Sequence, residues 1–205
     1  MFEGIKKALT RRRLGPPIVV ISGLPRSGTS MMMNMLKGGG LDLGIDEIRK
    51  ADEDNPKGYF ELEQVKDLDK GDKDPGWLRA YRGKGVKIIS FLIPHLPSDN
   101  YYKIVFMRRE LDEVMASQAK MLTRRDEEDK RGDDEKMKRN YSVHLKKVNF
   151  EMRESMHIDH LYVDYKEVVK DPRAQAEAIA SFLDMNLDPA KMAAAVDAKL
   201  YRNRS

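Results

Sequence analysis

Short apolar runs recur along the chain, and each has the length and composition of a buried parallel strand. They lie at 18–21, 86–89, 102–107 and 161–163. The runs are rich in valine, isoleucine and other bulky residues, which favour strands that a parallel sheet buries on both faces. A further short strand or turn is expected at 41–45. The pattern therefore predicts a sheet of four or five strands.

Between these runs, apolar residues recur at helical spacing. The spacing predicts helices over 111–122 and 137–156, and Pro172 and Pro189 each open a further helix, ending near 183 and 200. A helix also follows the first strand and its loop, and another begins near Phe2. Because strands and helices alternate, we expect a three-layer α/β domain around a mainly parallel sheet.

The length of the chain and the distribution of its charges define the expected organisation. A chain of 205 residues suffices for one domain with a sizeable core, so a single domain over 1–205 is predicted. Residues 1–16 form a basic amino-terminal segment, and residues 123–139 mix charges of both signs. The second segment is expected to be a mobile connection or frayed helix that serves as a lid or faces a substrate.

Composition excludes several classes of site and partner. The absence of cysteine excludes disulfides and thiolate metal sites, and it fits a reducing compartment. There is no apolar stretch as long as a membrane span and no secretory signal, so a cytoplasmic protein is expected. The net charge of +4 indicates an anionic ligand, but the interspersed charges do not indicate nucleic acid. Since no carboxylates are seen to support His144, His157 or His160, no metal site is predicted.

The loop after the first strand carries the clearest chemical signal. In Ser-Gly-Leu-Pro-Arg-Ser-Gly-Thr-Ser, from Ser22 to Ser30, two glycines permit backbone angles that other residues avoid. A strand, a tight glycine turn and a helix start direct backbone N–H groups and the positive end of the helix dipole at one place, which favours a phosphate. The spacing matches the nucleotide-binding P-loop, but Thr29 stands where that loop has its lysine. Binding of a magnesium nucleotide in the usual way is therefore not favoured.

The loop carries its cation earlier, as Arg26. The run Pro25-Arg26-Ser27-Gly28-Thr29 resembles the loop with which sulfotransferases bind the 5′-phosphosulfate of 3′-phosphoadenosine 5′-phosphosulfate (PAPS), in the form typical of the tyrosylprotein branch. The segment Asn-Pro-Lys-Gly-Tyr-Phe-Glu at 55–61 is similar to one found in bacterial and carbohydrate sulfotransferases. The resemblance implies a P-loop NTPase-like fold.

Further residues match the pattern of that family. Arg109 and Ser117 have the spacing with which sulfotransferases hold the 3′-phosphate of PAPS. Tyr165, seven residues before Pro172, resembles the tyrosine that packs near the adenine. Arg202 belongs to a basic carboxyl-terminal segment that is either a frayed tail or, as the resemblance implies, a segment that closes over the 3′-phosphate. Since open parallel sheets bind ligands at their carboxyl edge, the glycine loop and the Arg109–Ser117 element should face one crevice.

The resemblance implies transfer of a sulfuryl group from PAPS to an acceptor hydroxyl or amine, without a metal. The N–H groups from Arg26 to Ser30 and the hydroxyls of Thr29 and Ser30 would hold the phosphosulfate. Arg26 would neutralise the charge that grows on the bridging oxygen as it leaves.

Two residues are candidates for the general base. His95 stands in a His-Leu-Pro setting like that of the cytosolic sulfotransferases. Glu61 matches the glutamate base of the branch whose loop carries arginine, provided that burial beside Tyr59 and Phe60 makes it basic enough. The similarity of the glycine loop to that branch narrowly favours Glu61 over His95 as the base. Three further carboxylates would follow as candidates: Asp46, Glu47 and Asp52.

Two other functions stay open on the sequence. One is a P-loop kinase in which Asp164, at the end of a predicted strand, binds magnesium. The other is an anion- or nucleic-acid-binding module that has the loop without the chemistry.

Overall fold

Five parallel strands form one sheet in the computed structural model, which describes residues 2–46, 58–71, 74–124 and 134–197. Each pairing between neighbouring strands is parallel. This confirms the predicted α/β fold with its parallel sheet. In spatial order the strands are β2 (Leu43–Gly44), β3 (Gly85–Lys87), β1 (Ile18–Gly23), β4 (Tyr102–Arg108) and β5 (Ile158–Asp164).

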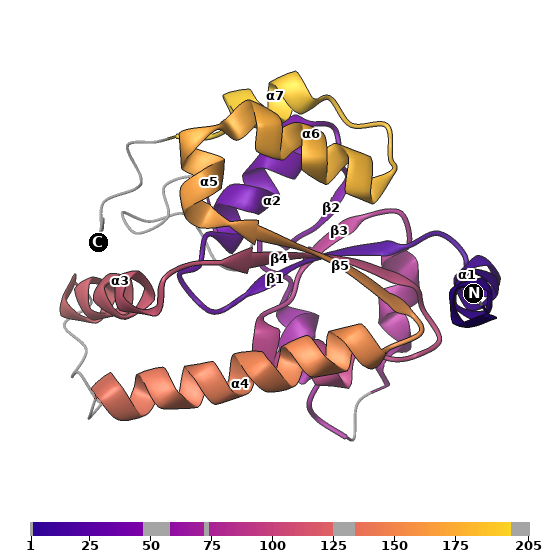
Figure 1. The fold of residues 1–205 in the computed structure, drawn as a ribbon, viewed down its shortest axis with the longest axis horizontal. Helices are drawn as coiled ribbons and strands as arrows, with labels where there is room; N and C mark the ends of the chain where they lie inside the picture. The colour runs from indigo at the N-terminus through magenta and orange to yellow at the C-terminus, as the bar shows by residue number, and fades with distance from the viewer. Residues whose placement is uncertain (1, 47–57, 72–73, 125–133, 198–205) are drawn as a thin grey trace.

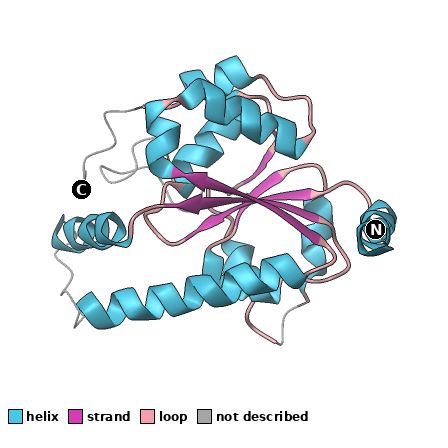
Figure 2. Cartoon of the chain, viewed as in Figure 1, coloured by secondary structure: helices cyan, strands magenta, loops and turns pink. Residues whose placement is uncertain are grey.

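Helices cover both faces of this sheet (Figure 1). On one face lie α2 (Thr29–Gly38), α5 (Tyr165–Lys170), α6 (Pro172–Leu183) and α7 (Pro189–Ala194); on the other lies α4 (Asp134–Glu154). The remaining helices are α1 (Phe2–Leu14), α3 (Leu111–Arg124) and the 3-10 helices η1 (Glu63–Asp67), η2 (Pro75–Tyr81) and η3 (Ser90–His95). Figure 2 shows the resulting three layers, as predicted. None of the described helices is long and apolar enough to cross a membrane.

The central strand β1 is almost wholly apolar because both of its faces are buried. All six residues of β1 are buried. Successive side chains of a strand point to opposite faces, so Val20 packs with Val148 of α4, while Ile21 packs with Met33 of α2. This two-sided burial explains why apolar and polar residues do not alternate along β1.

Several predicted boundaries differ from the structure; β5, for example, begins at 158 rather than 161, and α7 ends at 194 rather than near 200. β3 ends at Lys87 rather than 89, because η3 begins at Ser90 and turns the chain under the sheet. α3 extends to Arg124 and α4 already begins at Asp134, so much of the predicted connection at 123–139 is helical. The ammonium of Lys138 in α4 forms an ion pair with Asp112 in α3, which ties the two helices together. Residues 125–133 lie outside the described part.

Candidate active site

The loop between β1 and α2 has the tight geometry that its glycines predict. Gly23 and Gly28 have φ angles of 147° and 101°, which L residues rarely adopt. A Cβ on Gly23 would lie 2.6 Å from the carbonyl oxygen of Met107, and one on Gly28 would overlap the Tyr165 ring. Because α2 starts directly afterwards at Thr29, the loop lies at the positive end of the helix dipole.

Ser27 lies at the centre of this loop with its side chain turned inward. The residue is 2% exposed, and among the described residues its hydroxyl has no hydrogen-bond partner. Buried polar groups are almost always hydrogen-bonded, so an orphaned hydroxyl in a loop of this shape fits an anionic ligand. The other predicted loop residues also surround the turn: Thr29 is buried, and Pro25 and Ser30 are half-buried.

Arg26 joins the loop to α3. Its backbone has a φ of 72°, unusual for a residue that is not glycine. Its Nε donates a hydrogen bond to Ser117 Oγ at 3.0 Å, across 91 residues of sequence. The carbonyl oxygen of Arg26 accepts a hydrogen bond from Arg109 Nη1 at 3.1 Å. The two predicted elements, the glycine loop and the Arg109–Ser117 pair, therefore meet at one place.

Arg109 is buried between three neighbours. Besides its bond to Arg26, its Nε donates to Glu113 Oε2 at 2.8 Å, and the two side chains are 9% and 4% exposed. Its guanidinium lies over the Tyr165 ring, 4.5 Å from the ring centroid. Burial raises the pKa of the Tyr165 hydroxyl, and the charge of Arg109 opposes that rise. Tyr165 is thus neutral and packed against both predicted motifs.

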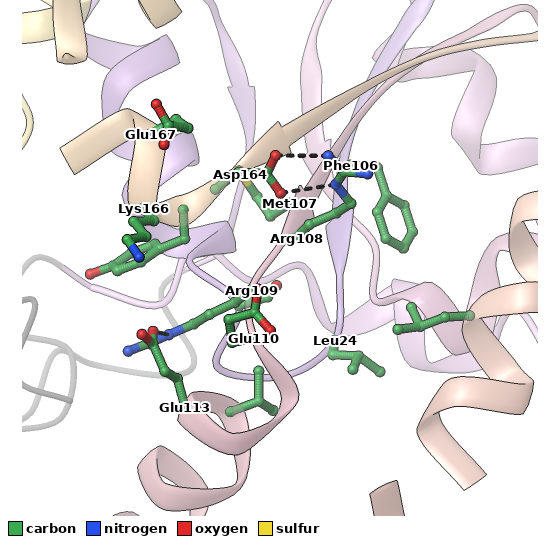
Figure 3. A pocket seen from close by; sticks show the side chains of 14 residues that line it. Leu24, Phe106, Met107, Arg108, Arg109, Glu110, Glu113, Asp164, Lys166 and Glu167 are labelled. Atoms are coloured by element: carbon green, nitrogen blue, oxygen red, sulfur yellow. Dashed lines mark hydrogen bonds and ion pairs between the residues drawn. The ribbon is translucent and has the colours of Figure 1, made fainter. Parts of the chain in front are cut away.

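A cavity of about 510 Å³ opens beside these residues, at the carboxyl ends of β4 and β5. Its volume lies in the range of small-molecule sites. Figure 3 shows Arg109 and Glu113 directed toward each other at its wall. The cavity combines an apolar floor with a charged rim; its lining residues are Leu24, Ser27, Phe106, Met107, Arg108, Arg109, Glu110, Glu113, Val114, Leu145, Asp164, Tyr165, Lys166 and Glu167.

Asp164, the candidate magnesium ligand of a kinase, forms an ion pair with arginine instead. Arg108 Nε and Nη2 donate to its two carboxylate oxygens at 3.0 and 2.7 Å, as the dashed lines in Figure 3 show. Within the described ranges no three His, Asp or Glu side chains are grouped so that they could hold a metal ion. This pairing gives no support to the kinase alternative.

Glu61 lies beside a buried lysine that sequence reasoning missed. Lys87, the last residue of β3, has a side chain that is 8% exposed. Its ammonium donates to the carbonyl oxygen of Tyr59 and lies 3.4 Å from Glu61 Oε1. Phe60 between them has a φ of 52°, so both of its neighbours contact the same ammonium. The available signal was a lysine inside an apolar strand run, Val86-Lys87-Ile88-Ile89.

The remaining predicted site residues have fewer contacts with the site or lie outside the described part of the chain. His95 is exposed at the end of η3, and no hydrogen bond or ion pair joins it to Glu61 or Lys87 in the part that the structure describes. The backbone N–H of Asp46 donates to the carbonyl oxygen of Glu61 at 2.9 Å. Asp46, a reserve candidate for the base, is therefore a neighbour of Glu61. Glu47, Asp52 and Arg202 lie outside the described residues.

Comparison with known proteins agrees with this geometry. The sequence model of the family described as "Sulfotransferase domain" matches residues 16–203, which is nearly the whole chain. A search of curated proteins finds no match. The matched range includes the glycine loop, the Arg109–Ser117 element and the Glu61–Lys87 pair. The chain therefore belongs to the sulfotransferase domain family and carries out sulfuryl transfer.

Proposed function

We propose that this protein transfers a sulfuryl group from PAPS to the hydroxyl or amine of an acceptor. The observation that carries the proposal is the junction of Arg26, Ser117 and Arg109, because it brings a loop suited to a phosphosulfate next to an arginine suited to a 3′-phosphate. A ligand that has both groups, one at each end of a ribose, would span these two places.

The loop residues would bind and orient the phosphosulfate. Backbone N–H groups from Arg26 to Ser30 and the orphaned Ser27 hydroxyl would donate hydrogen bonds to its oxygens. Arg26 would meet the charge that develops on the bridging oxygen when its bond to sulfur breaks. Preorganised donors of this kind lower a barrier by about 3 to 4 kcal/mol each.

Glu61 would act as the general base. As the acceptor oxygen forms its bond to sulfur, its proton would pass to the Glu61 carboxylate. Lys87 lies 3.4 Å from that carboxylate and would hold it in place while adding positive charge near the transferred group. His95 stays the rival base, because its imidazole is exposed to solvent and its ordinary chemistry suits proton transfer.

Ligand binding tests the proposal. Titration calorimetry should show that the product nucleotide, adenosine 3′,5′-bisphosphate (PAP), binds tightly, whereas ATP with magnesium and a DNA duplex bind weakly or not at all. The expected preference follows from the 3′-phosphate, which ATP lacks. Equal affinity for PAP and ATP with magnesium would overturn the proposal, and preferential binding of DNA would favour the non-catalytic module.

A further inference from the structure

Glu113 is a buried carboxylate at the wall of a cavity proposed to bind phosphates. Its side chain is only 4% exposed. Burying a carboxylate is costly, and placing one beside an anion site weakens the attraction for that anion. Neither the binding of the phosphosulfate nor the proton transfer proposed above uses this group. Its position therefore needs another explanation.

The contacts of Arg109 supply that explanation. Glu113 accepts from Nε at one edge of the guanidinium, at 2.8 Å. The carbonyl oxygen of Arg26 accepts from Nη1 at a second edge, at 3.1 Å. The Tyr165 ring lies against the face, 4.5 Å from its centroid to the guanidinium carbon. Two edges and one face together fix both the plane and the rotation of this planar group.

Glu113 and Ser117 act from the same face of α3. Residues four positions apart in a helix lie one turn apart on one face. Glu113 accepts from Arg109, and Ser117 accepts from Arg26, so one helix face holds both arginines. The relative placement of the two predicted anion subsites thus depends on α3.

We infer that Glu113 is a positioning residue: it fixes the guanidinium of Arg109 so that the site selects nucleotides carrying a 3′-phosphate. This inference rests on the proposed function. Glu113 itself touches no substrate and acts through Arg109. Selectivity for the 3′-phosphate then depends on the position of the Glu113 carboxylate oxygen. A negative charge at another position would not hold Arg109 in the same orientation.

Three substitutions separate position from charge. Glu113→Met keeps the volume but removes the acceptor, Glu113→Asp keeps the charge but withdraws it by one methylene, and Glu113→Gln keeps an acceptor oxygen at the original reach. The readout is the ratio of the dissociation constants for adenosine 5′-phosphate and PAP, which differ only in the 3′-phosphate. We expect the ratio to fall at least tenfold in the Met and Asp variants and less than threefold in the Gln variant.

Glu177→Gln is the matched control, because Glu177 is also a helical glutamate paired with an arginine four residues away, but it is exposed and does not line the cavity. It should leave the ratio unchanged. A second test uses Arg109→Ala as the background: there, Glu113→Asp should have no further effect on the ratio, since the residue acts through Arg109. A purely structural role would lower the melting temperature without changing the ratio.

The inference is overturned if folded Glu113→Met and Glu113→Asp proteins keep the wild-type ratio, or if Glu113→Asp still lowers the ratio in the Arg109→Ala background. A loss in Glu113→Gln equal to that in Glu113→Met would also overturn it, because charge would then be the cause. Failure of the proposed function looks different: the wild-type protein itself would not distinguish PAP from adenosine 5′-phosphate.

Discussion

At the scale of single residues, backbone strain coincides with the expected chemistry. Among the described residues, left-handed φ angles outside glycine occur at Arg26, Phe60 and Asp184. The first is the proposed catalytic arginine, and the second immediately precedes the proposed base. Such conformations cost about 1 to 3 kcal/mol each and persist only where the surrounding contacts determine them. At Arg26 those contacts are the hydrogen bonds to Ser117 and Arg109.

Arg26→Ala is expected to lower the turnover number about a hundredfold or more, while PAP affinity changes much less. The reason is that Arg26 stabilises negative charge on the bridging oxygen, and this charge develops mainly during transfer. Steady-state turnover with PAPS and titration of PAP measure the two quantities. Arg79→Ala removes an exposed arginine paired with Asp99 and is the control. Equal losses in turnover and binding would reduce Arg26 to a binding residue.

The two candidate bases can be ranked by their substitutions. Glu61→Gln should lower turnover at least about a hundredfold with PAP affinity preserved, because the amide cannot accept the proton. His95→Asn should cost less than about tenfold, since His95 is exposed and, within the described residues, no hydrogen bond or ion pair joins it to Glu61 or Lys87. If the larger loss falls on His95, the assignment of the base reverses.

At the scale of elements, the turn from β1 into α2 depends on close packing against the start of α5. A Cβ on Gly28 would overlap the Tyr165 ring, whereas Gly40, with a similar φ of 98°, has no atom within 4 Å of such a Cβ. Both substitutions strain the backbone, but only the first also overpacks. The pair therefore isolates the steric contribution.

Gly28→Ala should reduce the free energy of unfolding by about 1 to 3 kcal/mol more than Gly40→Ala, because overpacking adds to the shared backbone strain. Urea denaturation of both variants measures the difference. PAP binding should be weakened in the Gly28 variant alone, since the loop must move to accommodate the methyl group. Equal free energies of unfolding in the two variants would show that the turn can relax around the added methyl group. The contact between Gly28 and Tyr165 would then not contribute to stability.

At the scale of the whole molecule, half-buried histidines couple stability to pH. Burial lowers the pKa of His144, His157 and His160 below the ordinary value, with the positive charges of Lys147 and Lys7 adding to the effect at His144 and His160, respectively. His144 lies 2.9 Å from Ser90 Oγ through its Nε2 and stacks on Phe91. A neutral histidine is therefore part of the packing between α4 and η3.

The melting temperature should fall as the pH is lowered below about 6.5, the ordinary pKa of histidine. With folded-state pKa values below those of the unfolded chain, these histidines stabilise the protein above the unfolded value, and the contribution is lost as the pH falls through the folded values. Melting curves between pH 8 and 5 would measure this. His144→Gln should flatten the dependence and the exposed His95→Asn should not; an unchanged slope in His144→Gln would contradict the assignment.

The sequence by itself determined the local features of this protein. The strands, most of the helices and the glycine turn were predictable because each rests on local causes: the period of apolar residues, the helix-opening prolines and the freedom of glycine at positive φ. The spacing of the loop and of Arg109 and Ser117 likewise lies within short stretches of chain, which is why the family resemblance could be seen. Boundaries such as the end of β3 at Lys87 depend instead on tertiary packing of the segment that follows the strand.

Only the tertiary structure decided which side chains meet. Arg26 and Ser117 are 91 residues apart, and Lys87 and Glu61 are 26 apart, so no periodicity within a single element connects them. Glu113 is an ordinary first-turn acid in the sequence, and its pairing with Arg109, four residues away, is local. The burial of the pair arises because β1 and β4 are neighbours, which brings the glycine loop beside the start of α3. Chain-distant contacts of this kind follow from strand order, and strand order is fixed by the packing of the whole domain.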